Sequence, residues 1–154
     1  MVSALVEKAA GGPAREIWAR TRVRVWPESY VLASLPLHRL ADASALIASR
    51  SVGFAALVVE RDEVSLTLVD TLWTGSALAA EAHAKGPFRA ITLDIDIDLD
   101  VCGYLAPAAT LLGEAGVSIV PQCAFLKDHL LVHAEKLETA VRVLEDWIGA
   151  CRRL

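Results

Sequence analysis

Residues 88–131 read FRAITLDIDIDLDVCGYLAPAATLLGEAGVSIVPQCAFLKDHLL, and this stretch decides the fold that the sequence predicts. Over 89–99, isoleucine and leucine alternate with threonine and aspartate. This period of two predicts a half-buried strand with its aspartates on the more polar face. After Gly103 the apolar residues recur at helical spacing. Strands are then expected over 117–123 and 129–133, on either side of a polar turn. The stretch therefore predicts a β-loop-α-β-β unit, and its glycine turn is where a ligand is expected.

The rest of the chain predicts a less regular set of similar elements ahead of this unit, and a closing helix after it. Pro27 is expected to end the first strand. Because hairpins separate the helices, the order predicts an α+β fold of the ferredoxin-like kind, with mixed or antiparallel sheets and helices on one face. In chain order, the further expected elements are helical pieces at 4–10 and 14–20, strands at 21–26 and 30–37, a short helix at 40–50, a hairpin of strands 54–60 and 63–70, a weak helix at 75–84 and a long helix at 135–151.

Composition excludes several classes of function. The net charge of −4 and the pI of about 5.5 leave no basic surface for nucleic acid. No apolar run approaches the length of about 18 residues that a membrane helix needs, and the N-terminus lacks the pattern of a signal peptide. We therefore expect a cytoplasmic protein. The hydrophobic fraction of 55% is above the globular average, which favours an extensive core or an oligomer.

No metal site or cofactor is predicted. The three cysteines are odd in number and form no C-x-x-C pair, which argues against a disulfide framework and a zinc site. The aspartates within 94–100 suggest a calcium loop, but the sixth loop position would be Leu99 or Val101 instead of glycine. Their alternation with Ile and Leu favours a solvated strand face. The cysteines are Cys102, Cys123 and Cys151.

Several motifs resemble those of the ACT domain, and more specifically those of small bacterial tandem-ACT proteins related to arginine-sensing regulators. The resemblance covers about residues 21–150 and predicts two ACT units in tandem, over 21–87 and 88–154. The helical pieces within residues 1–20 are expected to form an N-terminal helical extension ahead of them. The matching motifs are GYLA at 103–106, LLGEAGVSI at 111–119, KDHLLV at 127–132, EVSL at 63–66 and the opening strands from Arg24 to Ser34.

ACT domains are regulatory modules that bind small molecules, most often amino acids, between paired units, so the resemblance implies a ligand sensor without catalysis. The family's binding loop matches the turn at 100–105, where backbone N–H groups at a helix start can meet a carboxylate. Glycine lets the backbone approach the ligand closely. The resemblance also implies that the ligand lies near the interface of the two units. The implied contacts are Val101, Cys102, Gly103, Tyr104, Leu105, Ser65, Leu66 and Asp128.

Alternatives remain at this stage. The chain could be an ACT-like scaffold that binds no ligand, or a small enzyme in which Cys102 is activated by His129 or His133. Asp128 could be a hairpin-turn residue without a ligand role. A homo-oligomer or a regulated protein partner is expected, and the sequence does not name the ligand.

Overall fold

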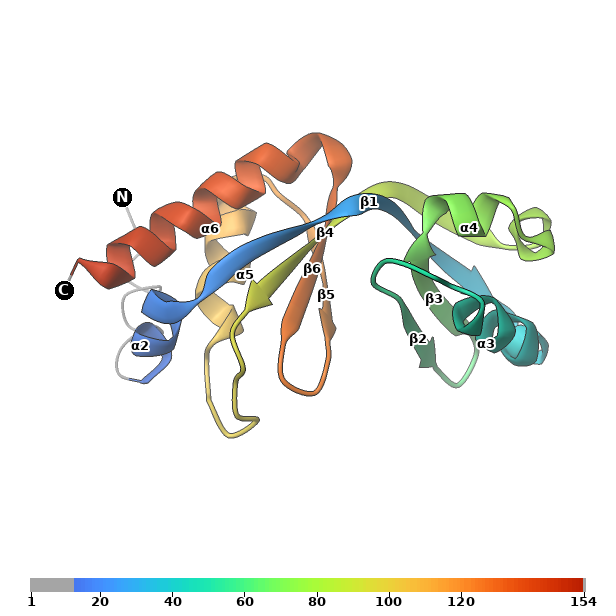
Figure 1. The fold of residues 1–154 in the computed structure, drawn as a ribbon, viewed down its shortest axis with the longest axis horizontal. Helices are drawn as coiled ribbons and strands as arrows, with labels where there is room; N and C mark the ends of the chain where they lie inside the picture. Colours follow the sequence, from blue (N-terminus) through green and yellow to red (C-terminus); the bar gives the residue numbers. More distant parts are fainter. Residues whose placement is uncertain (1–12, 154) are drawn as a thin grey trace. The chain divides into compact units, whose positions relative to one another are not determined.

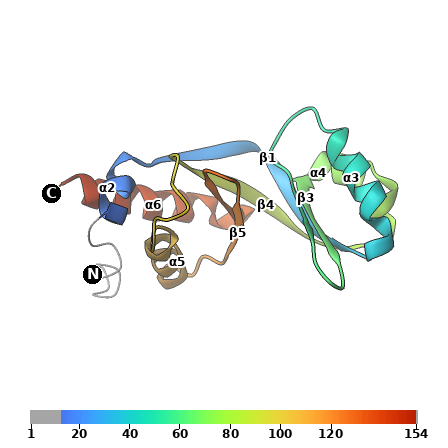
Figure 2. The same cartoon turned by 90° about the horizontal axis from the view of Figure 1, so that it is seen from below.

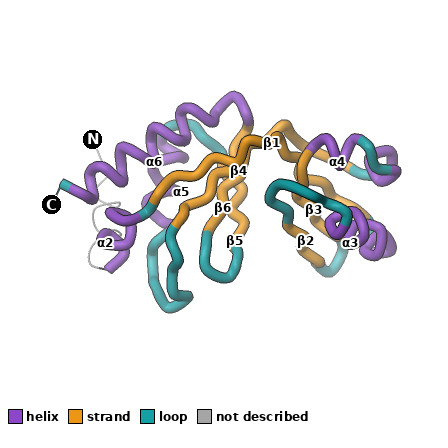
Figure 3. Tube along the Cα trace, viewed as in Figure 1, coloured by secondary structure: helices purple, strands orange, loops and turns teal. Residues whose placement is uncertain are grey.

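The computed structural model describes residues 13–153, so the helical piece expected at 4–10 lies outside the described residues. Two hairpins, each made of two consecutive strands, lie between helices along the chain, as Figures 1 and 3 show, and the fold is α+β. The helices and strands are α2 (Pro13–Arg20), β1 (Arg22–Leu35), α3 (Leu40–Ala48), β2 (Ala56–Val59), β3 (Val64–Val69), α4 (Asp70–Thr74), β4 (His83–Asp94), α5 (Leu105–Glu114), β5 (Ile119–Cys123), β6 (Asp128–His133) and α6 (Leu137–Arg152).

The strands are hydrogen-bonded in the order β2-β3-β1-β4-β6-β5. The pairs β1–β3, β2–β3 and β5–β6 are antiparallel. The chain divides into two compact units. The first, here called the split unit, comprises the chain up to Val25 and from Ile91 onwards; the second, the inserted unit, is Trp26–Ala90. The long strands β1 and β4 each pass through both units.

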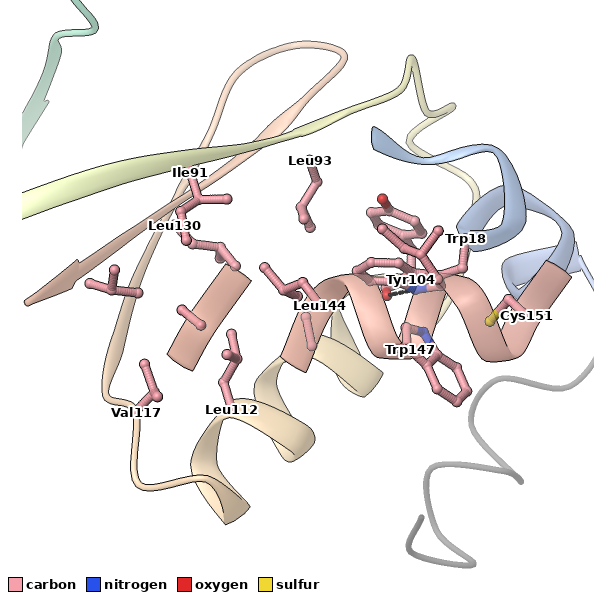
Figure 4. Packing of buried hydrophobic residues seen from close by; sticks show 14 residues of the cluster. Trp18, Ile91, Leu93, Tyr104, Leu112, Val117, Leu130, Leu144, Trp147 and Cys151 are labelled. Atoms are coloured by element: carbon pink, nitrogen blue, oxygen red, sulfur yellow. Dashed lines mark hydrogen bonds between the residues drawn. The ribbon is translucent and has the colours of Figure 1, made fainter. Parts of the chain in front are cut away.

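In the split unit, helices α5 and α6 contact each other, α5 contacts β5, and α6 contacts β6 (Figures 1 and 2). The stripe of apolar residues on each helix explains this packing, because each stripe buries itself against the same sheet. Figure 4 shows the resulting core. Its largest fully buried side chains are Trp18, Ile91, Leu93, Leu112, Leu130 and Leu144.

The inserted unit has its own core, formed by β1, β3 and the helices α3 and α4 that contact β3. Strand β3 lies between β1 and β2 and buries Val64, Leu66 and Leu68. These apolar residues occupy alternate positions, as expected for a strand whose apolar side chains face one layer of helices, and Thr67 between them is buried as well.

Two predicted strand boundaries are wrong. Strand β1 continues through Pro27, because its ladder with β3 begins only at Tyr30 and a missing N–H at 27 breaks no bond there. Strand β4 begins at His83 and ends at Asp94. The helix expected at 75–84 is also wrong: a short helix, Asp70–Thr74, and a 3-10 turn, Ala77–Ala80, precede the strand.

The aspartates after β4 therefore do not form a strand face. The chain turns at Ile95, whose N–H donates to the Leu93 carbonyl at 3.0 Å. The Asp98 carboxylate then accepts the backbone N–H of Asp100 at 3.2 Å. Local side-chain acceptors of this kind compete with a strand ladder, so the alternation in the sequence continues beyond the strand itself.

The structural units differ from the predicted division at 20/21 and 87/88. Helix α2 packs on α6 and so belongs to the split unit instead of forming a separate extension. Two bonds from Arg152 hold this contact, to the carbonyls of Ala19 at 2.8 Å and Thr21 at 3.3 Å. Residues at opposite ends of the described chain thus share one core.

Candidate functional site

A cavity of about 350 Å³ lies in the split unit between the β4–α5 loop and the turn of the β5–β6 hairpin. These two teal segments lie side by side in Figure 3. The volume falls within the range of about 300–1,000 Å³ that is typical of small-molecule sites. The lining residues are Ile97, Asp98, Leu99, Val101, Gly103, Tyr104, Leu105, Ala106, Cys123, Ala124, Phe125, Leu126, Lys127 and Asp128.

One wall of the cavity is the start of helix α5. Gly103 has φ +77°, a left-handed conformation that favours glycine, and it turns the chain into the helix. Tyr104 occupies the N-cap position without a side-chain bond that caps the helix. Pro107 has no N–H, so Leu105 and Ala106 supply the donors of the first turn. Backbone donors and the positive end of the helix dipole make this wall suited to an anionic group.

Tyr104 is held in place by Trp18 of α2 and by Thr21, the residue that follows α2. Its carbonyl accepts the indole N–H of Trp18 at 2.8 Å, and its ring stacks on the Trp18 ring with centroids 4.7 Å apart. Its hydroxyl is 2.9 Å from Oγ1 of Thr21. Burial raises the pKa of the Tyr104 phenol, which therefore stays neutral.

The opposite wall is the end of the β5–β6 hairpin. Cys123 and Asp128 are the last pair in the register of these strands, and both line the cavity. The Asp128 carboxylate, which accepts a hydrogen bond from the Cys123 thiol, raises the pKa of that thiol to about 11. The turn is closed by the Ala124 N–H, which donates to the Lys127 carbonyl at 2.8 Å. Asp128 is half-buried and lines the cavity, so its carboxylate forms part of the cavity wall.

Surface ion pairs connect this hairpin turn to the end of β4. The Lys127 ammonium lies 3.1 Å from an Asp94 oxygen and also meets Asp96, while Arg24 reaches the other Asp94 oxygen at 2.8 Å. The bond from Lys127 holds the pKa of the Asp94 carboxyl below its ordinary value. A backbone bond of 3.0 Å, from Ile97 N–H to the Leu126 carbonyl, joins the same two segments. Asp94 and Asp96 therefore position the walls of the cavity.

The cavity brings together five of the eight predicted site residues, which are Val101, Gly103, Tyr104, Leu105 and Asp128. Cys102 is exposed, and its thiol lies 3.8 Å from the Asp100 carbonyl. Ser65 and Leu66 lie on β3 of the inserted unit. The side chain of Leu66 is fully buried in that unit's core, and Ser65 is half-buried opposite Ser34.

Sequence reasoning missed the apolar rim of the cavity. Leu99 is 76% exposed and Phe125 is 78% exposed, and Leu126 beside them is also exposed. Two large apolar residues within a hairpin turn are unusual, because turns favour polar residues and glycine, and this signal was available in the sequence. The contact between Trp18 and Tyr104 left no such signal, since the two residues are 86 positions apart.

The structure also places the residues of the alternative functions. His129 is buried in β6, where its Nδ1 lies 2.8 Å from Oγ1 of Thr92. Burial lowers the pKa of this imidazole. Within residues 13–153, no group of three His, Cys, Asp or Glu side chains could hold a metal ion. In the same range, no helix has both the length and the apolar character needed to span a bilayer.

The fold is similar to several solved structures. A protein of unknown function from Vibrio cholerae, described as a possible transport protein, has a TM-score of 0.69 at 22% identity, over 87% of this chain and 94% of that one. The ligand-free regulatory subunit of aspartate kinase from Thermus thermophilus has a TM-score of 0.58 at 11% identity, over 82% and 97%. Aspartokinase III of E. coli, in complex with aspartate and ADP, has 0.61 at 20%, over 84% and 33%.

Sequence comparison locates the likeness in the half of the chain that holds the cavity. No curated protein matches the sequence. Residues 84–146, which include the cavity-lining loop, helix α5 and the β5–β6 hairpin, match the family model of the ACT domain.

Proposed function

We propose that this protein is a regulatory module that binds a free amino acid in the cavity between the β4–α5 loop and the β5–β6 hairpin. One observation carries the proposal: the uncapped start of α5 and the carboxylate of Asp128 line the same cavity of about 350 Å³. A zwitterion needs both of these groups. Its carboxylate would meet the N–H groups of Leu105 and Ala106, and its ammonium would meet Asp128.

The remaining lining favours an amino acid with an apolar side chain. Leu99, Phe125 and Leu126 place large apolar surfaces at the rim, while Lys127 is engaged by Asp94 and Asp96. An apolar ligand side chain would bury part of these exposed surfaces and gain about 25 cal/mol for each Å² removed from water.

The comparisons favour a regulatory role over catalysis. The match to the ACT domain covers the whole cavity, and the chain is similar in fold to a regulatory subunit of aspartate kinase. We infer further that the inserted unit, whose order is β-α-β-β-α-β, is a second ACT-like unit, and that the loaded protein changes its association with itself or with a partner protein. Ser65, with its half-buried hydroxyl, is a proposed ligand contact of the inserted unit itself, whereas Leu66 could contribute only main-chain groups.

Two other functions make different predictions. An ACT-like scaffold without a ligand would show no response to any amino acid. An enzyme that uses Cys102 would lose its activity in the Cys102→Ser variant, whereas amino-acid binding would survive that substitution, because Cys102 is not among the residues that line the cavity.

The proposal is tested by thermal unfolding of the full chain in the presence of each of the twenty amino acids. A ligand at a hundredfold excess over its Kd should stabilise the protein by about 2.7 kcal/mol. No increase in Tm with any amino acid at millimolar concentration would refute the proposal.

Titration calorimetry of two variants then locates the site. Asp128→Asn should weaken binding at least about tenfold, because a hydrogen bond to a charged group contributes about 1.5–3 kcal/mol. Asp62→Asn makes the same change in the exposed turn between β2 and β3 and should bind like the wild type. Equal affinities for all three proteins would contradict the assignment of Asp128. A Ser65→Ala variant measured alongside tests the proposed contact of the inserted unit.

A further inference from the structure

Helix α2 makes an extensive contact with the residue at which α5 begins. The carbonyl, the ring and the hydroxyl of Tyr104 each have a partner within residues 18–21. Figure 4 shows Trp18 against Tyr104 beside α6, with the hydrogen bond between them dashed. Trp18 is fully buried and Tyr104 is 3% exposed, so solvent does not compete for these bonds. Tyr104 therefore has little conformational freedom once α2 is in place.

The partners of Tyr104 are themselves fixed in position. The hydroxyl of Thr21 also lies 3.0 Å from the Ile17 carbonyl, one turn back in α2. The rings of Trp18 and Tyr104 are nearly parallel, with 17° between their planes. Tyr104 follows Gly103 and precedes Leu105, and both neighbours line the cavity. The position of α2 therefore sets where the donors of the first turn of α5 point.

Polar contacts with α6 add to the burial of Trp18 in attaching α2 to the rest of the split unit. Arg15 donates to the Ala150 carbonyl at 3.2 Å, and its guanidinium lies 5.8 Å from the centroid of the Trp147 ring. Arg152 donates to the carbonyls of Ala19 and Thr21 from an exposed side chain. None of the six residues in these contacts lines the cavity.

We propose that α2 is a clamp that holds the β4–α5 loop in its ligand-binding conformation, with Trp18 and Thr21 as positioning residues. This inference rests on the proposed function for its ligand. If the loop binds ligand in the clamped state, docking of α2 on α6 and occupation of the cavity are linked equilibria. The linkage is reciprocal: release of α2 weakens binding, and the ligand holds α2 in place.

The test compares two tryptophans of the same core. Trp18→Phe removes the indole N–H that Tyr104 accepts. Trp147→Phe is the matched control, because Trp147 is also buried, its Nε1 has no hydrogen-bond partner, and phenylalanine keeps an aromatic ring beside the Arg15 guanidinium. The Kd for the amino acid found by the thermal screen should rise at least about fivefold in Trp18→Phe, the lower end of the usual range of coupling between linked sites. In Trp147→Phe it should stay within about twofold of the wild type.

A second pair of variants guards against simple loss of packing. Thr21→Val removes the hydroxyl that meets Tyr104 but keeps the shape of the side chain, whereas Thr21→Ser retains the hydroxyl. We expect weaker binding only in Thr21→Val, with wild-type affinity in Thr21→Ser. Equal affinity in Thr21→Val and Thr21→Ser, or equal losses in the two tryptophan variants, would overturn the clamp.

One measurement separates failure of the clamp from failure of the proposed function. Hydrogen exchange of the Val101 amide, which donates to the Asp98 carbonyl at 3.1 Å, reports on the loop without any ligand. Exchange should be faster in Trp18→Phe than in Trp147→Phe. If no amino acid binds the wild type, the proposed function fails, and this comparison still decides the clamp: equal exchange in the two variants overturns it.

Discussion

Replacing Gly103 by alanine should separate the backbone role of this residue from its role at the cavity. Gly103 has φ +77° and Gly116 has φ +69°, so the two glycines at the ends of α5 hold similar left-handed conformations. An alanine in that region costs roughly 1–2 kcal/mol. A methyl group at Gly116 would meet no atom within 4 Å, so the strain is its whole effect there. Both variants should therefore lose about 1–2 kcal/mol of unfolding free energy, or about 2–4 °C in Tm for each kcal/mol in a chain of this size.

Ligand affinity is expected to distinguish the two variants. Gly103 lines the cavity and Gly116 does not. A change at 103 would shift the donors of Leu105 and Ala106 away from the bound carboxylate and weaken two charge-assisted hydrogen bonds. Denaturant unfolding measures the stability of each variant, and calorimetry measures its affinity. We expect similar stabilities, with weakened binding only in Gly103→Ala. Wild-type affinity in Gly103→Ala, or an equal loss in Gly116→Ala, would refute the assignment of this loop.

Three further predictions follow from the structure. Gly53→Ala should destabilise the protein by roughly 1–3 kcal/mol more than Gly116→Ala, measured by denaturant unfolding, because its Cβ would lie 2.4 Å from Cγ2 of Val69. Burial raises the pKa of the Tyr30 phenol from 10.0 to about 12. The neutral phenol therefore contributes its full stabilisation of the folded state below pH 10, and this contribution is lost between pH 10 and about 12. An ultraviolet titration that shows phenolate formation near pH 10 in the folded protein would contradict this. In a Cys102→Ser background, Asp128→Asn should lower the pKa of the Cys123 thiol from about 11. Iodoacetamide should then alkylate Cys123 faster at pH 8 than in the parent protein, because more of the thiol is ionised. An unchanged rate would argue against the hydrogen bond between Cys123 and Asp128.

The sequence predicts the helices of the split unit well, because their cores are encoded by local periodicity. The stripe that predicts the last helix includes Ala140, Leu144, Ile148 and Cys151, and the structure buries all four. Helix α5 likewise buries Ala108 and Leu112 from its predicted stripe. A helix keeps its hydrogen bonds within the segment, so a short window of sequence contains most of the information that defines it.

The end of β4 could not be predicted from the same kind of window. The alternation of Ile and Asp continues to Leu99, yet the strand ends at Asp94, because the next backbone donors find partners elsewhere. One of them, the N–H of Ile97, bonds to Leu126 in a hairpin 29 residues further along the chain. The strand therefore ends where a local turn, marked by the bond from Ile95 to Leu93, combines with this non-local partner. The five predicted residues that share the cavity came from resemblance. The apolar residues of the hairpin turn indicate the rim from sequence alone, whereas the contact with Trp18 came only from the structure.

The insertion of one unit into the other has a consequence for how the chain folds. The first segment of the split unit ends at Val25 and its second segment begins at Ile91. The first segment therefore cannot complete its contacts until the residues after Ile91 have been synthesised. During synthesis the inserted unit is complete while α6, the partner of α2, is still missing. Folding of the inserted unit also shortens the loop that must close between the two segments of the split unit, because the ends of that loop lie on β1 and β4 of the folded insert. Each halving of a loop's effective length saves about 0.6 kcal/mol of closure entropy. We therefore expect the inserted unit to fold first and the split unit after it, which places completion of the ligand cavity at the end of the folding pathway.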